Sequence, residues 1–212
     1  MGETSDPAGD TVGQDRVVVL AGPSGAGKSR LAARLQDAHG WPILRLDDFY
    51  RDEDDPLVPR SEQLGIVDWD HPDSWNRVAA LDALATLATT GRVTTPVYDL
   101  SASRAVGTAE LTAEPHDLIL AEGIFAADII PDLRLRGLLA GAFCVHHRPG
   151  VTFVRRLVRD LSERRKPPLT LVRRGLALMR EEPALVRRQQ DLGAEPARAR
   201  HLEPRLSALA RR

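Results

Sequence analysis

The chain has 212 residues, of which 42% are hydrophobic and 4% aromatic, and its formal net charge is −1. This length suffices for one domain with its own core, which must consist mainly of aliphatic side chains. No stretch approaches the roughly 20 apolar residues of a membrane span, so we expect no membrane partner. The only cysteine, Cys144, cannot form an intramolecular disulfide, and the simplest expectation is a cytoplasmic protein.

Charge is distributed unevenly along the chain. Residues 1–147 carry 23 acidic and 12 basic side chains, whereas residues 148–212 carry 7 and 17. A basic segment can indicate nucleic-acid binding, but Phe153 is the only aromatic residue of this segment that could stack on a base. We therefore expect no nucleic-acid partner. A segment that closes over a polyphosphate, or a solvated helix surface, fits better.

The first predicted elements surround a glycine-rich loop. Residues 1–15 are acidic and polar, which is typical of a disordered tail and wrong for a secretory signal. The apolar run 17–21 predicts a strand, and residues 30–38 predict a helix that Gly40 ends. Between them lies G-x-x-x-x-G-K-S, the phosphate-binding loop of nucleotide-binding enzymes when it joins a strand to a helix. Its residues expected to bind the nucleotide phosphates are Gly22, Ser24, Gly25, Ala26, Gly27, Lys28 and Ser29.

Lysine usage supports a working loop. Only Lys28 and Lys166 are lysines, while the other 27 of the 29 basic residues are arginines. The loop requires a compact charge on a flexible stem, which a guanidinium does not supply. We expect Lys28 to extend from an exposed loop to the outer phosphates, and the Ser29 hydroxyl to bind magnesium.

Strands and helices continue to alternate along the chain. A second strand is predicted at 41–46, a long excursion at 51–72, and a helix at 74–90 that Gly91 ends. One apolar face of that helix is expected to contain Val78, Leu81, Leu84, Ala85 and Leu87. The later predictions are extended chain at 93–100, strands at 116–123 and 142–147, a helix at 129–139 and a largely helical remainder. This order predicts an α/β fold in which a parallel sheet is covered by helices on both faces.

Acidic residues end two of the predicted strands. Asp47 and Asp48 follow the second strand, and Glu122 ends the strand at 116–123. Ligands of open parallel sheets bind beyond the carboxyl ends of the strands, where these acids would meet the phosphate loop. Such an arrangement is what a magnesium–triphosphate site requires, although acids at strand ends can also be simple helix caps.

Five further motifs resemble, in order, those of the uridine kinase family, within the group that includes phosphoribulokinase. They are LDDFYR at 46–51, DWDHPDSW at 68–75, PVYDLSASR at 96–104, LILAEGIFA at 118–126 and VRRLVRDLSERRK at 154–166. With the phosphate loop, the resemblance covers residues 16–166. It implies a P-loop kinase domain of the nucleoside and nucleotide kinase type over 16–212, with an acceptor-binding excursion at about 49–104 and a helical lid at about 150–168.

The resemblance also implies how phosphoryl transfer is divided among the residues. Asp47 would accept the proton of the acceptor hydroxyl, while Lys28 and Arg159 would stabilise the transferred group. The implied magnesium ligands are Ser29, Asp47 and Glu122, and the lid residues implied to clamp ATP are Arg156, Arg159 and Arg164. Arg156 and Arg159 are three residues apart and share a helix face, which could instead be a solvated charged surface.

The acceptor site implied by the resemblance consists of Tyr50, Trp69, Asp70, Tyr98 and Arg156. Aromatic faces would stack on a base, and Asp70 would bind the hydroxyls of a ribose. Trp69 has an alternative role as a core anchor, because tryptophan is usually largely buried.

The chain departs from the family pattern at two places. Ala102 stands where the family has a histidine that contacts the pyrimidine, and residues 164–168 differ from the usual end of the lid. Beyond Lys166 there is no match, and the family's last strand is not evident. The implied activity is ATP- and magnesium-dependent phosphorylation of a small-molecule acceptor, with the 5′-hydroxyl of uridine or cytidine favoured. Another metabolite hydroxyl, or a nucleotide-dependent regulatory protein, is the alternative. The sequence leaves the oligomeric state open, with a homo-oligomer as one option.

Overall fold

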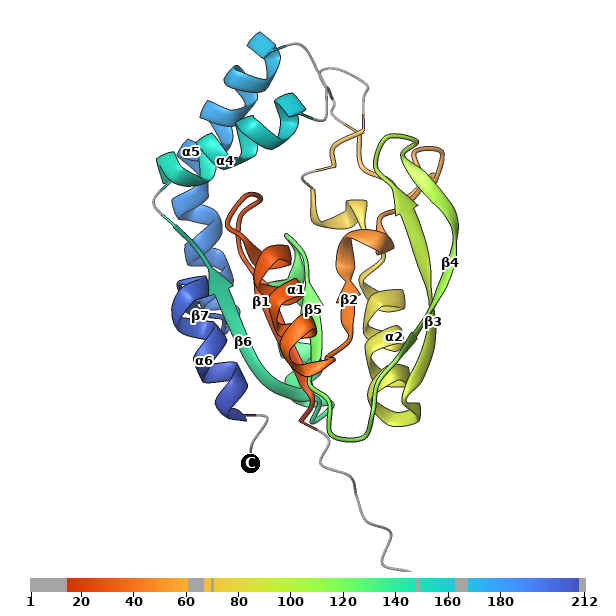
Figure 1. The fold of residues 1–212 in the computed structure, drawn as a ribbon. Helices are drawn as coiled ribbons and strands as arrows, with labels where there is room; N and C mark the ends of the chain where they lie inside the picture. The colour runs from red at the N-terminus through yellow and green to blue at the C-terminus, as the bar shows by residue number, and fades with distance from the viewer. Residues whose placement is uncertain (1–14, 61–66, 70, 148, 163–167, 210–212) are drawn as a thin grey trace, which may run out of the picture.

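The computed structural model describes residues 15–60, 67–69, 71–147, 149–162 and 168–209 (Figure 1). At its centre is a five-stranded parallel sheet in the order β2-β5-β1-β6-β7. Its strands are β1 Val17–Ala21, β2 Ile43–Arg45, β5 Ile119–Glu122, β6 Leu139–Val145 and β7 Glu195–Ala197. The predicted parallel α/β sheet is therefore confirmed.

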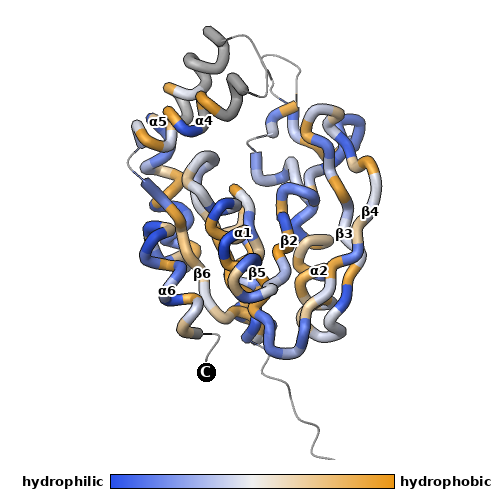
Figure 2. The backbone as a smooth tube through the Cα atoms, viewed as in Figure 1, coloured by the Kyte–Doolittle hydropathy of each residue, from blue (hydrophilic) through white to orange (hydrophobic). Residues whose placement is uncertain are grey.

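Alternate residues of β1 belong to two different cores, because successive side chains of a strand point to opposite faces. Val18 and Leu20 pack with apolar residues of α1 (Lys28–His39) and α6 (Ala199–Leu209). Val17 and Val19 pack with residues of α2 (Arg77–Thr90) and α3 (Ile130–Leu135). The hydrophobic stretches of the chain gather in the central strands (Figure 2). Helices thus cover both faces of the sheet, as the sequence predicts.

Strand β7 is absent from the sequence-based prediction. Glu195, Pro196 and Ala197 pair in parallel with the end of β6, at the edge of the sheet. Three residues without apolar alternation give no strand pattern, and proline is tolerated in sheets at an edge strand. The sequence analysis finds no evident strand beyond Lys166, and β7 is the strand that it misses.

A two-stranded antiparallel hairpin stands beside the main sheet (Figure 1). It consists of β3 Arg92–Asp99, which the sequence predicts as extended chain, and β4 Arg104–Thr112, which it does not. Most side chains of β4 are exposed, so that strand has no buried face to produce an apolar alternation. The hairpin contacts α2 and the short 3-10 segment η1 (Leu46–Phe49) that follows β2.

Two helices follow the sheet strand β6 and pack on one another: α4 Pro149–Ser162 and α5 Pro168–Asp191. The buried hydroxyl of Thr152 donates a hydrogen bond to Glu182 Oε1 at 3.1 Å. A Cβ at Gly175 would lie 2.6 Å from the ring of Phe153, so glycine permits this close helix contact. Among the described residues, no helix combines the length and apolar character needed to cross a bilayer.

Helix α2 differs from prediction at its first turn. Leu81, Leu84 and Leu87 are buried as expected, but Val78 is 66% exposed. Val78 lines an open cavity of about 770 Å³ together with Arg77 and Asp132 instead of packing into the core.

This difference gives a test of the fold. Leu84→Ala leaves a void in a fully buried site, and we expect it to lower the free energy of unfolding by about 2–5 kcal/mol. The same truncation at Val78 should change it by less than about 0.5 kcal/mol. Urea denaturation of both variants measures the difference, and equal losses would contradict the assigned packing of α2.

Candidate active site

The phosphate loop folds closely over the start of α1. Gly22 has φ 137°, and a Cβ there would lie 2.1 Å from the carbonyl oxygen of Val145 on β6. Gly27, with φ 92°, caps the helix without any side-chain hydrogen bond. Both positions require glycine, since L side chains rarely adopt these conformations. The loop therefore leads directly into the first turn of α1, whose backbone N–H groups and dipole favour an anion.

Lys28 does not extend from an exposed loop as the sequence analysis expects. It is only 7% exposed, and its Nζ donates hydrogen bonds to the carbonyl oxygens of Gly22, at 2.8 Å, and Pro23, at 3.2 Å. The carbonyl groups of the loop accept these bonds because the loop curves around the ammonium group. The side chain is thus held beneath the loop, where its charge acts on both Asp47 and Glu122.

Ser29 and Glu122 are in direct contact. The Ser29 hydroxyl donates to both carboxylate oxygens of Glu122, at 3.1 Å each. Glu122 is 5% exposed and lies beside Leu20 in the register of β1 and β5, whereas Ser29 is exposed. Burial raises the pKa of the Glu122 carboxyl; the nearby charge of Lys28 opposes this shift and that of Asp47 adds to it.

Asp47 lies in η1, immediately after β2 ends. Burial raises the pKa of its carboxyl, while Lys28, Arg45 and a hydrogen bond from the backbone N–H of Ile124 lower it. A Cβ on Gly123 would lie 3.2 Å from Asp47 Oδ1 and 2.9 Å from the Cβ of Leu46. Glycine at this position therefore allows the end of β5 to approach η1.

The neighbouring acid, Asp48, has a different environment. Its Oδ1 accepts a hydrogen bond from the backbone N–H of Tyr98 at 3.2 Å, and its Oδ2 lies 4.0 Å from Arg45 Nε. Asp48 therefore joins η1 to the hairpin, while Asp47 faces Lys28 and Glu122. This distinguishes the two candidates that the sequence places side by side.

The residues expected to bind magnesium come together at one edge of the sheet. Ser29, Asp47 and Glu122 offer a hydroxyl and two carboxylates, which are the oxygen ligands that Mg²⁺ prefers. Burial raises the pKa of Glu122 and repulsion from the nearby Asp47 carboxylate adds to the shift, so a divalent cation would be favourable there. In the described ranges no three His, Cys, Asp or Glu side chains form a metal cluster. The donor set fits an ion that completes its shell with water and phosphate oxygens.

Aromatic side chains gather beside Asp47. The ring of Tyr50 lies 5.8 Å from that of Trp69, 5.9 Å from that of Tyr98 and 6.2 Å from that of Phe125. Tyr50, Trp69 and Tyr98 are half-buried, so Trp69 is not the core anchor considered above. The core tryptophan is Trp75, which is 3% exposed and stacks on Phe125 with 6.1 Å between the ring centroids. Phe125 was not predicted as part of this cluster, although it directly follows the matched E-G-I motif.

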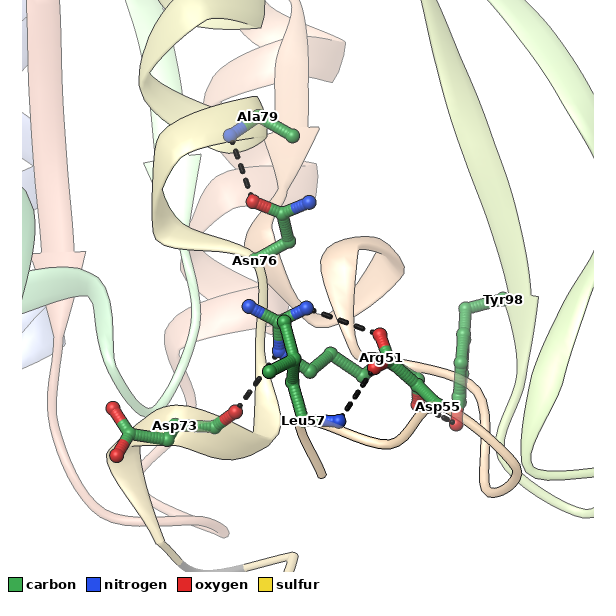
Figure 3. Close-up of polar contacts among 7 residues, drawn as sticks. All are labelled: Arg51, Asp55, Leu57, Asp73, Asn76, Ala79 and Tyr98. Atoms are coloured by element: carbon green, nitrogen blue, oxygen red, sulfur yellow. Dashed lines mark hydrogen bonds and ion pairs between the residues drawn. The ribbon is translucent and has the colours of Figure 1, made fainter. Parts of the chain in front are cut away.

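Arg51 connects three segments near these rings through polar contacts (Figure 3). Its guanidinium pairs with Asp55 at 3.0 Å and donates to the carbonyl oxygen of Asp73 at 3.2 Å. Its own carbonyl oxygen accepts the hydroxyl of Tyr98 at 3.0 Å. Burial, together with the nearby acids Asp52 and Glu53, raises the pKa of Tyr98 to about 12. Tyr98 thus stays a neutral phenol with its ring fixed beside Tyr50.

Ala102 lies in the turn between β3 and β4. Asp99 Oδ1 holds this turn by accepting hydrogen bonds from the N–H of Ser101 at 2.7 Å and from that of Ala102 at 3.3 Å. Ala102 lines a cavity of about 320 Å³, whose other lining residues are Glu53, Asp54, Arg60, Ser103 and Arg104. Ala102, which stands where the family has a histidine, therefore borders this cavity and not a packed core.

Four predicted residues cannot be placed from their side chains. Asp70 and Arg164 lie outside the described residues. Arg156 and Arg159 are three residues apart on α4, and only the backbone of these two residues is described. Their assigned roles stay predictions.

Comparison with known proteins identifies the family. The model of the Phosphoribulokinase / Uridine kinase family matches residues 17–189. The chain belongs to this family. It is accordingly an ATP-dependent kinase of a small molecule.

Several curated relatives are uridine kinases. The enzyme of Clostridium botulinum strain 657 is 28% identical over 169 residues, covering 77% of this chain and 78% of the relative. That of Leuconostoc citreum is 30% identical and covers 70% of each chain. A solved structure from Silicibacter sp. TM1040, provisionally named a fructose transport system kinase, aligns with a TM-score of 0.60 at 21% identity, covering 91% of this chain and 92% of that one. This last similarity shows the shared fold.

The separation of Asp47 from Asp48 predicts different effects of two similar substitutions. We expect Asp47→Asn to lower kcat of the kinase by about 10²–10⁴-fold, because a group that can accept a proton next to Lys28 is lost. Asp48→Asn should have a small effect, since its amide oxygen can still accept the bond from Tyr98. Acceptor-dependent ADP release measures both. A damaging Asp48→Asn with a harmless Asp47→Asn would reverse the assignment.

The buried carboxyl of Glu122 predicts a dependence of stability on pH. Its folded-state pKa is raised, so ionising it opposes folding, and stability is lost as the pH rises through the carboxyl range. Glutamine keeps an acceptor for Ser29 without the charge. Without nucleotide or metal, Glu122→Gln should therefore have a higher Tm than wild type at pH 7, and the gain should disappear below about pH 4. A Tm gain of equal size at both pH values would refute this explanation.

Proposed function

We propose that the kinase transfers the γ-phosphoryl group of Mg·ATP to the 5′-hydroxyl of a nucleoside, with uridine and cytidine favoured. The position of Asp47 carries this proposal. Asp47 interacts electrostatically with Lys28 of the phosphate loop, and it lies three residues before Tyr50, the centre of the half-buried aromatic cluster. An acceptor hydroxyl bound at Asp47 would therefore lie between the phosphate loop and the aromatic cluster, whose ring faces suit a flat base.

The phosphates would be bound by the first turn of α1 and by Lys28, whose Nζ already faces the loop. Ser29, Asp47 and Glu122 would hold magnesium, which would supply positive charge to neutralise the phosphates. The lid residues proposed to add positive charge over the triphosphate are Arg156, Arg159 and Arg164. Positioning and charge neutralisation account for most of the catalysis of phosphoryl transfer, so this set of groups is sufficient.

The chemical step follows from the place of Asp47. The acceptor oxygen attacks the γ-phosphorus, its O–H proton passes to the Asp47 carboxylate, and the bond from that phosphorus to the bridging oxygen of ADP breaks. The carboxylate therefore orients the hydroxyl and removes a proton from the same atom that forms the new bond. Its partial burial places this exchange away from bulk water.

Nucleoside binding is supported by the aromatic cluster and by the relatives named uridine kinase. Tyr50, Trp69 and Tyr98 would stack on the base, and Asp70 and Arg156 would bind polar groups of the nucleoside. Stacking is tolerant of base identity because every base has a π face. Discrimination between bases therefore depends on polar contacts elsewhere.

A second candidate is a kinase of another small hydroxyl compound. Ala102 favours it, because alanine offers no hydrogen bond where the family's histidine contacts the pyrimidine, and a cavity adjoins it. A regulatory protein without an acceptor is disfavoured by the membership of this kinase family.

Measuring kcat/KM for uridine, cytidine, thymidine and adenosine separates these candidates. A site that relies on shape and stacking discriminates by only about 10–200-fold, and we expect the four values to lie within that range. Ala102→His should increase the preference for uridine and cytidine by restoring a polar partner. Strong selectivity for uridine in the wild type would mean that another residue contacts the base. No turnover of any nucleoside would favour the second candidate.

A further inference from the structure

A glutamine is buried between α5, β6 and the turn that follows β5. Gln189 is 1% exposed. Its Nε2 donates a hydrogen bond to the carbonyl oxygen of Ile124 at 3.0 Å, and its Oε1 accepts one from Cys144 Sγ at 3.2 Å. Both ends of the amide are therefore engaged, at opposite sides of a buried side chain.

These two contacts admit one orientation of the amide. A carbonyl oxygen only accepts hydrogen bonds, so the NH₂ group must face Ile124 and the oxygen must face the thiol. Burial raises the pKa of Cys144 to about 11, and the thiol thus keeps its proton at neutral pH. Gln189 is fixed as a donor toward the turn.

The turn connects this glutamine to the catalytic edge. Ile124 donates its own backbone N–H to the carboxylate of Asp47. The preceding residue, Gly123, allows the turn to approach Asp47 Oδ1 closely. The two peptide groups that flank the Cα of Ile124 are thus bound on one side by α5 and on the other side to Asp47.

We propose that Gln189 is a positioning residue of the kinase, which sets the place of the Asp47 carboxylate through the backbone of Ile124. The inference rests on the proposed function, in which Asp47 orients the acceptor hydroxyl. A polar side chain in this buried place costs free energy of desolvation unless both ends are bonded, and an aliphatic residue would fill the volume more simply. The contact with the Ile124 carbonyl is what the aliphatic residue could not supply.

Helix α5 also connects this turn to the helical region after β6. Glu182, two turns before Gln189, accepts the hydroxyl of Thr152 on α4. Arg188 pairs with Asp128 at 2.7 Å, a few residues beyond the turn. The ion pair of Arg188 anchors the helix, but it does not touch the peptide groups next to Asp47. Arg188 thus anchors α5, whereas its neighbour Gln189 contacts the turn next to Asp47.

The test compares Gln189→Met with Gln190→Met, its exposed neighbour on the same helix. Methionine has similar length but cannot donate to Ile124. We expect kcat for the best nucleoside to fall by about 10–100-fold in Gln189→Met, with KM for ATP within about twofold of wild type, because a displaced reacting group lowers the rate of transfer. Gln190→Met should match wild type. A folded Gln189→Met with normal kcat, judged by thermal melting, would overturn the proposal.

Two further variants keep the test informative if Gln189→Met does not fold. Cys144→Ala removes the donor that orients the amide and should lower kcat, whereas Cys144→Ser keeps an O–H donor and should restore it. Equal kcat in both variants would contradict the proposal.

A double-mutant cycle identifies the route of the effect. In an Asp47→Asn background, Gln189→Met should lower the single-turnover rate no further, since its target is already lost. Equal fold losses in both backgrounds would show that Gln189 acts elsewhere and overturn the inference. A harmless Asp47→Asn would instead refute the proposed function, an outcome distinct from a harmless Gln189→Met.

Discussion

The site depends on a group of charges that the fold buries together at the carboxyl edge of the sheet. Lys28 lies beneath the phosphate loop, and the carboxyl groups of Asp47 and Glu122 face its charge. Burial raises the pKa of both acids, so one ammonium group does not fully compensate for two carboxylates. A divalent cation bound together with a nucleotide would compensate for the remaining negative charge of the two carboxylates. The remaining features of the edge keep these groups close: glycine at 22 and 123, and the Ser29 hydroxyl on Glu122.

The topology of the sheet brings these groups together from distant parts of the chain. Because β1 lies between β5 and β6, the loop after β1 meets Glu122 on one side and the end of β6 on the other. Strand β2 pairs with β5 and carries Asp47 to the same edge. The hairpin is then held to η1 by the hydrogen bond from the backbone N–H of Tyr98 to Asp48, and the ring of Tyr98 lies beside that of Tyr50. The proposed phosphate site and the proposed acceptor surface thus share one short segment after β2.

Sequence reasoning could predict a candidate site because several of its motifs are local and lie next to strands with a strong apolar pattern, as at 17–21 and 118–122. It failed where the determinant is tertiary. Val78 has the spacing of a buried residue but adjoins an open cavity. Strands β4 and β7 have no buried alternation, and only their partners make them strands. The burial of Lys28 depends on carbonyl groups that a folded loop supplies. Gln189 is one of two adjacent glutamines in a basic helix, and no pattern in the sequence distinguishes it.

The most direct test of the central claim is the thermal melting of the protein with a non-hydrolysable ATP analogue, in the presence and absence of Mg²⁺. If the buried acids and the phosphate loop form one magnesium–nucleotide site, Tm should rise markedly only when both ligands are present. A ligand at 100 times its Kd stabilises by about 2.7 kcal/mol. Glu122→Gln should lose most of the part that depends on magnesium. The same rise in Tm with the analogue and a chelator, in wild type and in Glu122→Gln alike, would contradict the account.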